Sequence, residues 1–134
     1  MLRVFKQHTG LLIASGVVVL KVRVMLTFSS YRSVLKEIES AEISTHFNKH
    51  RDSSLLVWAV ERSARLVPAA SCLTKALALR WLLAKSGQEC TIRIGVAKSA
   101  EGSVEAHAWV IQNEKVLIGG ENSEHIKFVP LVDI

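Results

Sequence analysis

The stretch SCLTKALALRWLLAKSG, residues 71–87, decides the fold of this 134-residue chain. Its apolar residues recur at helical spacing, which predicts a helix with one buried side. Those residues are Leu73, Ala76, Leu77, Leu79, Leu83 and Ala84. Ser71 is a typical N-cap residue, and Lys85 and Gly87 are typical of a helix C-terminus. Cys72 therefore takes the first helical position, and the question is whether this thiol is structural or reactive.

After Gly87 the apolar residues alternate instead, which is the period of a β-strand. CTIRIGVAK, residues 90–98, predicts a half-buried strand with Cys90 facing inward. AHAWVI, residues 106–111, predicts a second strand. His107, Trp109 and Ile111 are expected on one face of that strand.

A tight turn at residues 112–115 is expected to return the chain antiparallel over residues 116–120. With the turn centred on Asn113 and Glu114, Gly119 and Gly120 are expected opposite Ala108 and His107. Residues 125–134 predict a last edge strand, in which Pro130 limits pairing.

Upstream of Ser71 the pattern is helical. Residues 3–40 predict one long or two shorter helices, and residues 53–67 predict another, capped by Asp52 or Ser53 and stopped by Pro68. The face expected to be apolar in that helix holds Leu55, Trp58, Ala59, Arg62 and Leu66. Helices followed by strands predict the α+β class with an antiparallel sheet. The length favours one domain over 1–134, with a basic helical part (1–50) before the core (51–134).

The net charge of +5 is confined to the N-terminal segment. Residues 1–36 hold six basic residues and no acidic one, whereas the rest of the chain is nearly neutral. This distribution does not favour nucleic-acid binding. Two cysteines are too few for a disulfide framework, so a cytoplasmic location is expected. The uncharged stretch 11–20 is shorter than a membrane span, and we expect it to pack on the core. Contact with a membrane surface or a partner is the alternative.

Cys72 and His107 form the most specific combination of residues in the chain. Only a thiolate is a strong nucleophile, and the amides at a helix start favour an anion. His107 follows 35 residues later between two alanines, whose small side chains allow another element to approach closely. A cysteine at a helix start with a histidine on a strand predicts a nucleophile and its base. Taken singly, each residue also fits a structural role.

The motifs SCLTKALALRWLLAKSG, IRIGV and AHAWV resemble the transglutaminase-like B2 proteins of lasso-peptide biosynthesis, the leader peptidases of the microcin J25 type. The resemblance extends over about residues 55–120. It implies a papain-like or transglutaminase-like α+β core and cleavage of the leader from a ribosomally made precursor peptide. It also implies two partners, a small leader-binding protein and an ATP-dependent cyclase.

On the same resemblance, Cys72 matches the nucleophile and His107 the base. The family commonly has an aspartate about where Gly119 stands here, and a glycine has no side chain to orient an imidazole. We take Glu121 as the third catalytic residue. Glu105, a backbone carbonyl or a water molecule are the alternatives, because this group only fixes the tautomer.

Other functions have weaker support in the sequence. A zinc site is not expected, because Cys72, Cys90, His107 and His125 lack paired ligand spacing. His46 and His50 stand four apart in a polar stretch without a further ligand. No phosphate-binding loop is present, so neither a cofactor nor ATP is expected on this chain. A transglutaminase-like acyl transferase and a non-catalytic scaffold between the leader-binding protein and the cyclase are the alternative functions.

Overall fold

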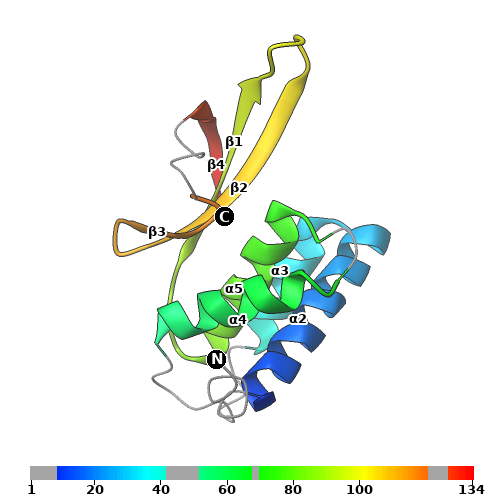
Figure 1. The fold of residues 1–134 in the computed structure, drawn as a ribbon, viewed down its shortest axis with the longest axis vertical. Coiled ribbons are helices and arrows are strands. Elements are labelled where there is room, and N and C mark those ends of the chain that lie inside the picture. The colour runs from blue at the N-terminus through cyan, green and yellow to red at the C-terminus, as the bar shows by residue number, and fades with distance from the viewer. Residues whose placement is uncertain (1–8, 42–51, 68–69, 121–126) are drawn as a thin grey trace.

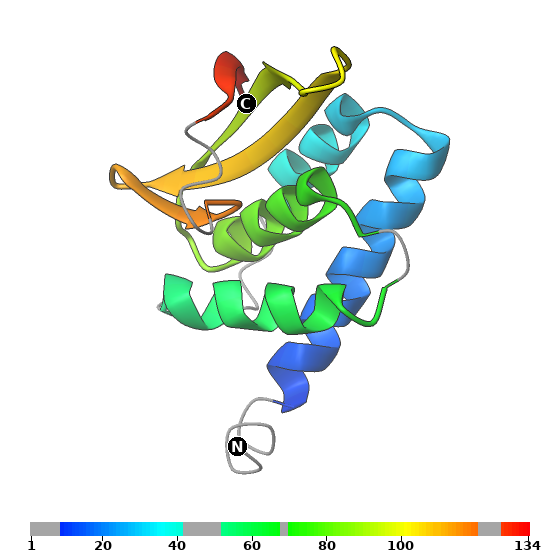
Figure 2. The same cartoon turned by 45° about the horizontal axis from the view of Figure 1, so that its top comes forward.

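The computed structural model describes residues 9–41, 52–67, 70–120 and 127–134, and it has the predicted α+β architecture (Figure 1). In these ranges, four helices precede a four-stranded antiparallel sheet. The helices are α2 (Thr9–Phe28), α3 (Tyr31–Ala41), α4 (Ser53–Ala64) and α5 (Cys72–Lys85). The strands are β1 (Thr91–Lys98), β2 (Val104–Gln112), β3 (Lys115–Ile118) and β4 (Val129–Asp133). The helices gather on one side of the sheet (Figure 2).

Both predicted ends of α5 are confirmed. The Ser71 side chain accepts a hydrogen bond from the Thr74 amide at 3.2 Å, as an N-cap does. Gly87 has φ +73°, and the following amide, of Gln88, donates to the Leu83 carbonyl at 2.8 Å. This is the helix end that glycine favours.

The prediction of a single buried side for α5 is too narrow, because α5 is the central helix of the molecule. It packs against α2, α3, α4 and β2, so residues around most of its circumference are buried. They are Thr74, Ala76, Leu77, Ala78, Leu79, Trp81, Leu82 and Leu83. A helix buried around most of its circumference has only a narrow polar side, and the sequence pattern accordingly showed only part of its contact surface.

The N-terminal segment forms two helices, with the break at Ser29 and Ser30. α2 is long and apolar enough to cross a membrane by length and composition, with a mean hydropathy of 2.0. It nevertheless packs against α4 and α5 along one face, as we expected for this segment. The residues buried on that face are Leu11, Ser15, Val18, Val19 and Val22.

α4 begins at the expected place, but the predicted apolar face is wrong in part. Asp52 is the N-cap, and its side chain accepts from the Ser54 amide at 3.0 Å. The buried residues are Leu56, Ala59, Val60 and Ser63, and only Ala59 was assigned to the buried face. Leu66 lies beyond the helix and is 87% exposed. The run LLVWAV is apolar on every side, so its sequence did not fix which side faces the core.

The sheet has the order β3-β2-β1-β4, and all its pairs are antiparallel. Asn113 and Glu114 have φ of 51° and 66°, which confirms the tight turn between β2 and β3. The register that we predicted beyond this turn is wrong by one residue. A bulge shifts the pairing between Val110 and Ile111, and β3 ends at Ile118 before the glycines. β4 is the expected edge strand, and a second irregularity lies beside Pro130.

The two faces of β2 belong to different buried clusters. Ala108 and Val110 join the main core beneath α5. Trp109 and Phe128 are also buried, at 3% and 6% exposure, but they lie outside that core. Because side chains alternate along a strand, they form a separate patch on the sheet face opposite the helices.

Candidate active site

Cys72 lies at the N-terminal end of the central helix, where its side chain is half-buried and packs against the main core. Ser71 caps the amide of Thr74. The amides of Cys72 and Leu73 precede the first intrahelical bond, so the helix itself provides no acceptor for them. Two such amides beside a thiol can stabilise negative charge on the sulfur or on a substrate oxygen.

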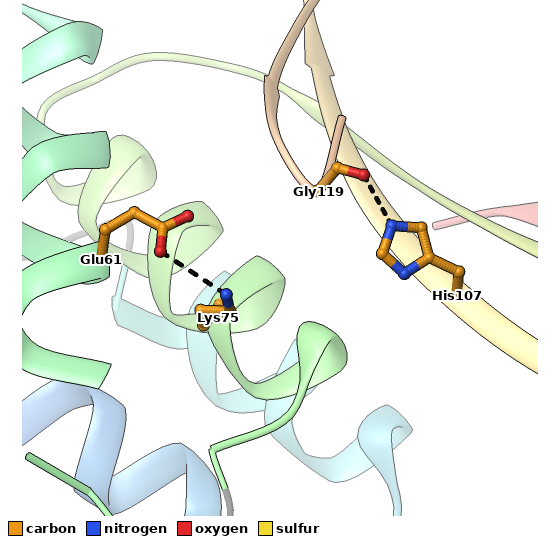
Figure 3. Close-up of polar contacts among 4 residues, drawn as sticks. All are labelled: Glu61, Lys75, His107 and Gly119. Atoms are coloured by element: carbon orange, nitrogen blue, oxygen red, sulfur yellow. Dashed lines mark hydrogen bonds and ion pairs between the residues drawn. The ribbon is translucent and has the colours of Figure 1, made fainter. Parts of the chain in front are cut away.

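His107 is held in one orientation on β2. Its Nε2 lies 2.6 Å from the Gly119 carbonyl oxygen (Figure 3). Its ring stacks with Trp109 and with Phe128, at centroid distances of 5.9 and 5.0 Å. A carbonyl oxygen only accepts hydrogen bonds, so the proton of the neutral ring belongs on Nε2 and its lone pair on Nδ1. His107 therefore has a free basic nitrogen at Nδ1.

Gly119 supplies this orienting group with its backbone, which is one of the alternatives left open by the sequence. Its φ of +84° lies in the region that glycine favours. A Cβ built there would lie 2.6 Å from the Ala108 carbonyl oxygen and 2.9 Å from the Trp109 Cβ. The position therefore excludes an aspartate in this conformation, and the carbonyl occupies the place next to His107.

Two acidic residues, Glu121 and Glu105, were the candidates for orienting His107, and the structure describes only one of them. Glu121 lies outside the described residues, so its catalytic role stays a prediction. Glu105 is exposed, and its Oε2 pairs with Lys127 Nζ at 3.6 Å. The described contact of Glu105 is thus with a cation at the surface and not with the imidazole.

Cys72 and His107 lie on two elements that pack against each other, α5 and β2. In the described structure the two side chains are not hydrogen-bonded to each other. Cys72 packs with the core to which Ala108 belongs, whereas His107 shares the opposite face with Trp109. Pairing of β2 with β3 ends at Val110, so in the described residues the part of β2 that holds His107 is paired only with β1. Acyl transfer through this pair therefore requires Cys72 Sγ and His107 Nδ1 to come within hydrogen-bond distance of each other.

A charged pair beside Cys72 was not identified from the sequence. Lys75 lies one turn after Cys72 on α5, and its Nζ is 3.5 Å from Glu61 Oε2 on α4 (Figure 3). Both side chains are about 30% exposed. The i, i+3 spacing from Cys72 was visible in the sequence, but the partner on α4 depends on tertiary packing. The pair fixes a cation near the first turn of the nucleophile helix.

Cys90 has the surroundings of an inert thiol. It precedes β1 and is half-buried against the core. Burial raises its pKa to about 11, against an opposing effect of Arg80. Among the described residues, no three histidine, cysteine or acidic side chains gather into a metal-ligand group.

The two cysteines should therefore differ in alkylation. At pH 7 we expect iodoacetamide to label Cys72 at least about tenfold faster than Cys90, because each pH unit below the Cys90 pKa lowers its thiolate fraction tenfold. Raising the pH towards 11 should increase the Cys90 rate. Peptide mapping after timed quenching measures both rates. Equal labelling rates of the two cysteines in the folded protein at pH 7, with no increase of the Cys90 rate at higher pH, would contradict this expectation.

Comparison with known proteins supports the family but not a specific relative. No curated protein and no solved structure gives a significant match. The family model described as "Transglutaminase-like superfamily" matches residues 16–133, which include all of α3, α4, α5 and the sheet. The chain therefore belongs to the transglutaminase-like superfamily.

Proposed function

We propose that this protein is a cytoplasmic cysteine peptidase that removes the leader peptide from a lasso-peptide precursor before the macrolactam is closed. The superfamily includes cysteine proteases and acyl transferases and typically acts through a cysteine. The observation that carries the proposal is the 2.6 Å bond between His107 Nε2 and the Gly119 carbonyl. This bond leaves Nδ1 as the base for a thiol.

In the proposed reaction, Cys72 Sγ attacks the scissile carbonyl carbon while His107 Nδ1 takes the thiol proton. The tetrahedral oxyanion accepts hydrogen bonds from the amides of Cys72 and Leu73. Collapse breaks the C–N bond, and His107 returns the proton to the leaving amine. Water then attacks the thioester, again with His107 as base, and this step releases the acid and restores the thiol.

The reaction requires Cys72 Sγ and His107 Nδ1 to meet, and bound substrate is proposed to bring them together. A peptide seated between α5 and β2 would need to bind the form in which Sγ and Nδ1 are hydrogen-bonded better than the form described here, in which they are not. Catalytic hydrogen bonds are often assembled only in the substrate complex.

A non-catalytic scaffold is the second candidate function, because Cys72 and His107 lie with different faces of β2 and the described partner of His107 is a backbone carbonyl. Such a protein would bind the leader-binding protein and the cyclase without cleaving the precursor. A transglutaminase-like acyl transferase would instead pass the acyl group from Cys72 to an amine. It would give a product heavier than the hydrolysed fragments, and mass spectrometry separates all three outcomes.

We expect this chain alone to cleave precursor slowly, and the leader-binding protein to increase the rate at least about tenfold. A few apolar contacts around Cys72 give only limited discrimination between peptides, roughly 10–200-fold each. A second protein that holds the leader raises its effective concentration at the site. A mass-spectrometric time course, with and without that protein at matched concentrations, measures this effect. Full-rate, leader-specific cleavage by the isolated chain would show that selection lies within these 134 residues.

A further inference from the structure

An apolar groove lies between α2 and the end of α4, away from Cys72 and His107. Its volume is about 490 Å³. The apolar residues that line it are Leu12, Gly16, Leu20, Leu66 and Val67, and the polar ones are Arg62, Ser63 and Arg65. Figure 2 shows α4 crossing the N-terminal half of α2, which is where the groove forms.

The groove continues into an exposed apolar stripe on α2. Spacings of four, three, four and four residues place the members of this stripe on one side of the helix. They are Ile13 (64% exposed), Val17 (60%), Leu20 (53%), Val24 (47%) and Phe28 (83%). Leu20 belongs to both the stripe and the groove. A stripe with this spacing is the surface that a second helix covers in helix–helix packing.

The charged residues that line the groove are both cations, Arg62 and Arg65. By helical geometry Arg23 flanks the stripe on one side, and Lys21 on the other side is paired with Glu37 Oε1 at 3.7 Å. No acidic residue lines the groove among the described residues. A second copy of this chain would present the same cations, and its segment 1–36 also holds six basic residues and no acid. An acidic occupant is therefore favoured over self-association.

Gly16 indicates that the occupant enters the groove. Glycine in a helix interior costs roughly 0.5–1 kcal/mol relative to alanine, and a Cβ at Gly16 would meet only the Ser63 Oγ, at 4.0 Å. Packing within this chain therefore does not require glycine at this position. Its absent side chain deepens the concave surface, and a concave slot fits an inserted side chain better than a flat lipid surface does.

We propose that the groove and the stripe are the docking site for an acidic amphipathic helix of a partner protein. One apolar anchor of that helix occupies the groove above Gly16. An acidic residue beside the anchor pairs with Arg65, and further apolar residues cover the stripe on α2. This inference does not depend on the proposed peptidase activity.

Two synthetic peptides of roughly 18 residues provide the probe, since shorter helices are marginal in water. Both carry leucines spaced three and four residues apart, and the remaining positions are mostly glutamate in one peptide and lysine in its twin. Fluorescence anisotropy of the labelled peptides at about 0.15 M salt gives the affinities, because weaker screening would exaggerate the charge effect. We expect the glutamate peptide to bind the full chain at least about tenfold more tightly than the lysine twin.

Gly16→Leu fills the groove and should weaken binding of the glutamate peptide at least about tenfold. Gly16→Ala is the matched control: it adds only one methyl group, 4.0 Å from the Ser63 Oγ, and should weaken binding less than Gly16→Leu does. Leu66→Glu is a second test that leaves the core intact, since Leu66 is 87% exposed. It should weaken the glutamate peptide and not the lysine twin.

Three outcomes would overturn the proposal. Equal affinity for the two peptides, or undiminished binding to Gly16→Leu, would show that neither charge nor the groove selects the occupant. Binding to vesicles of phosphatidylcholine and phosphatidylserine, undiminished by Gly16→Leu and without peptide binding, would assign the surface to a membrane. A dimer of the unmodified chain that Gly16→Leu dissociates would assign it to a second copy.

Discussion

Cys72→Ala is expected to lower precursor cleavage at least about 10³-fold, measured by mass spectrometry in the presence of the leader-binding protein. Removing a nucleophile leaves only the contribution of binding and oxyanion stabilisation, so losses of this size are typical. The helix itself should persist, because alanine has a higher helix propensity than cysteine and the Ser71 cap is unchanged.

Cys90→Ala is the matched control, because it removes the other thiol of the chain from the start of β1. Since burial keeps Cys90 protonated near neutral pH, this variant should retain most of the cleavage. His107→Ala should lose nearly as much activity as Cys72→Ala, since a nucleophile and its base act as a unit. Comparable cleavage by Cys72→Ala and the unmodified protein would remove the peptidase assignment and leave the scaffold function.

The features predicted correctly from the sequence are those that local signals determine. The caps of α5 depend on Ser71 and Gly87, and the turn before β3 depends on two residues that adopt positive φ. The class of the fold follows from the change of period after Gly87, which separates the helices from the strands. Each of these signals lies within a few residues of the feature that it predicts.

The errors arise where long-range packing decides between alternatives that are equal locally. The run LLVWAV is apolar on all sides, so only contact with α2 and α5 selects Leu56 and Val60 for the core. The bulge beside Val110 shifts the glycines by one residue, and no turn rule predicts it. The sequence also placed His107 on the same strand face as Trp109 correctly, but it did not predict that this face lies away from α5.

In the candidate site, too, local sequence signals predicted some features and tertiary packing decided the others. The sequence identified Cys72 and His107 by residue type and context. The partner of His107 is a backbone carbonyl, which every residue has, so residue type gave no signal for it. The only trace was the glycine itself, whose positive φ allows the carbonyl to point at the imidazole.

Gly119→Asp tests this interpretation, because it restores the residue that the resemblance leads one to expect at about this position. We expect the variant to lose roughly 2–5 kcal/mol of unfolding free energy. A side chain at positive φ costs about 1–2 kcal/mol, and a Cβ at 2.6 Å from the Ala108 carbonyl adds an overpacking cost of about 1–3 kcal/mol. The melting temperature should fall by roughly 10 °C, as measured by circular dichroism or calorimetry.

Gly16→Ala also adds a side chain to a glycine, but we expect it to raise the unfolding free energy and not to lower it. Its new methyl group lies on a helix and meets only the Ser63 Oγ, at 4.0 Å, so the unfolding free energy should rise by roughly 0.4–1 kcal/mol. If Gly119→Asp instead kept its stability and increased precursor cleavage, an aspartate would be the better partner of His107. The carbonyl would then be a substitute for a lost acid. The expected result is that Gly119→Asp loses stability and cleavage together, while Gly16→Ala keeps both. That result would show that the backbone at Gly119 positions His107, so the glycine is a requirement of this site and not a defect in it.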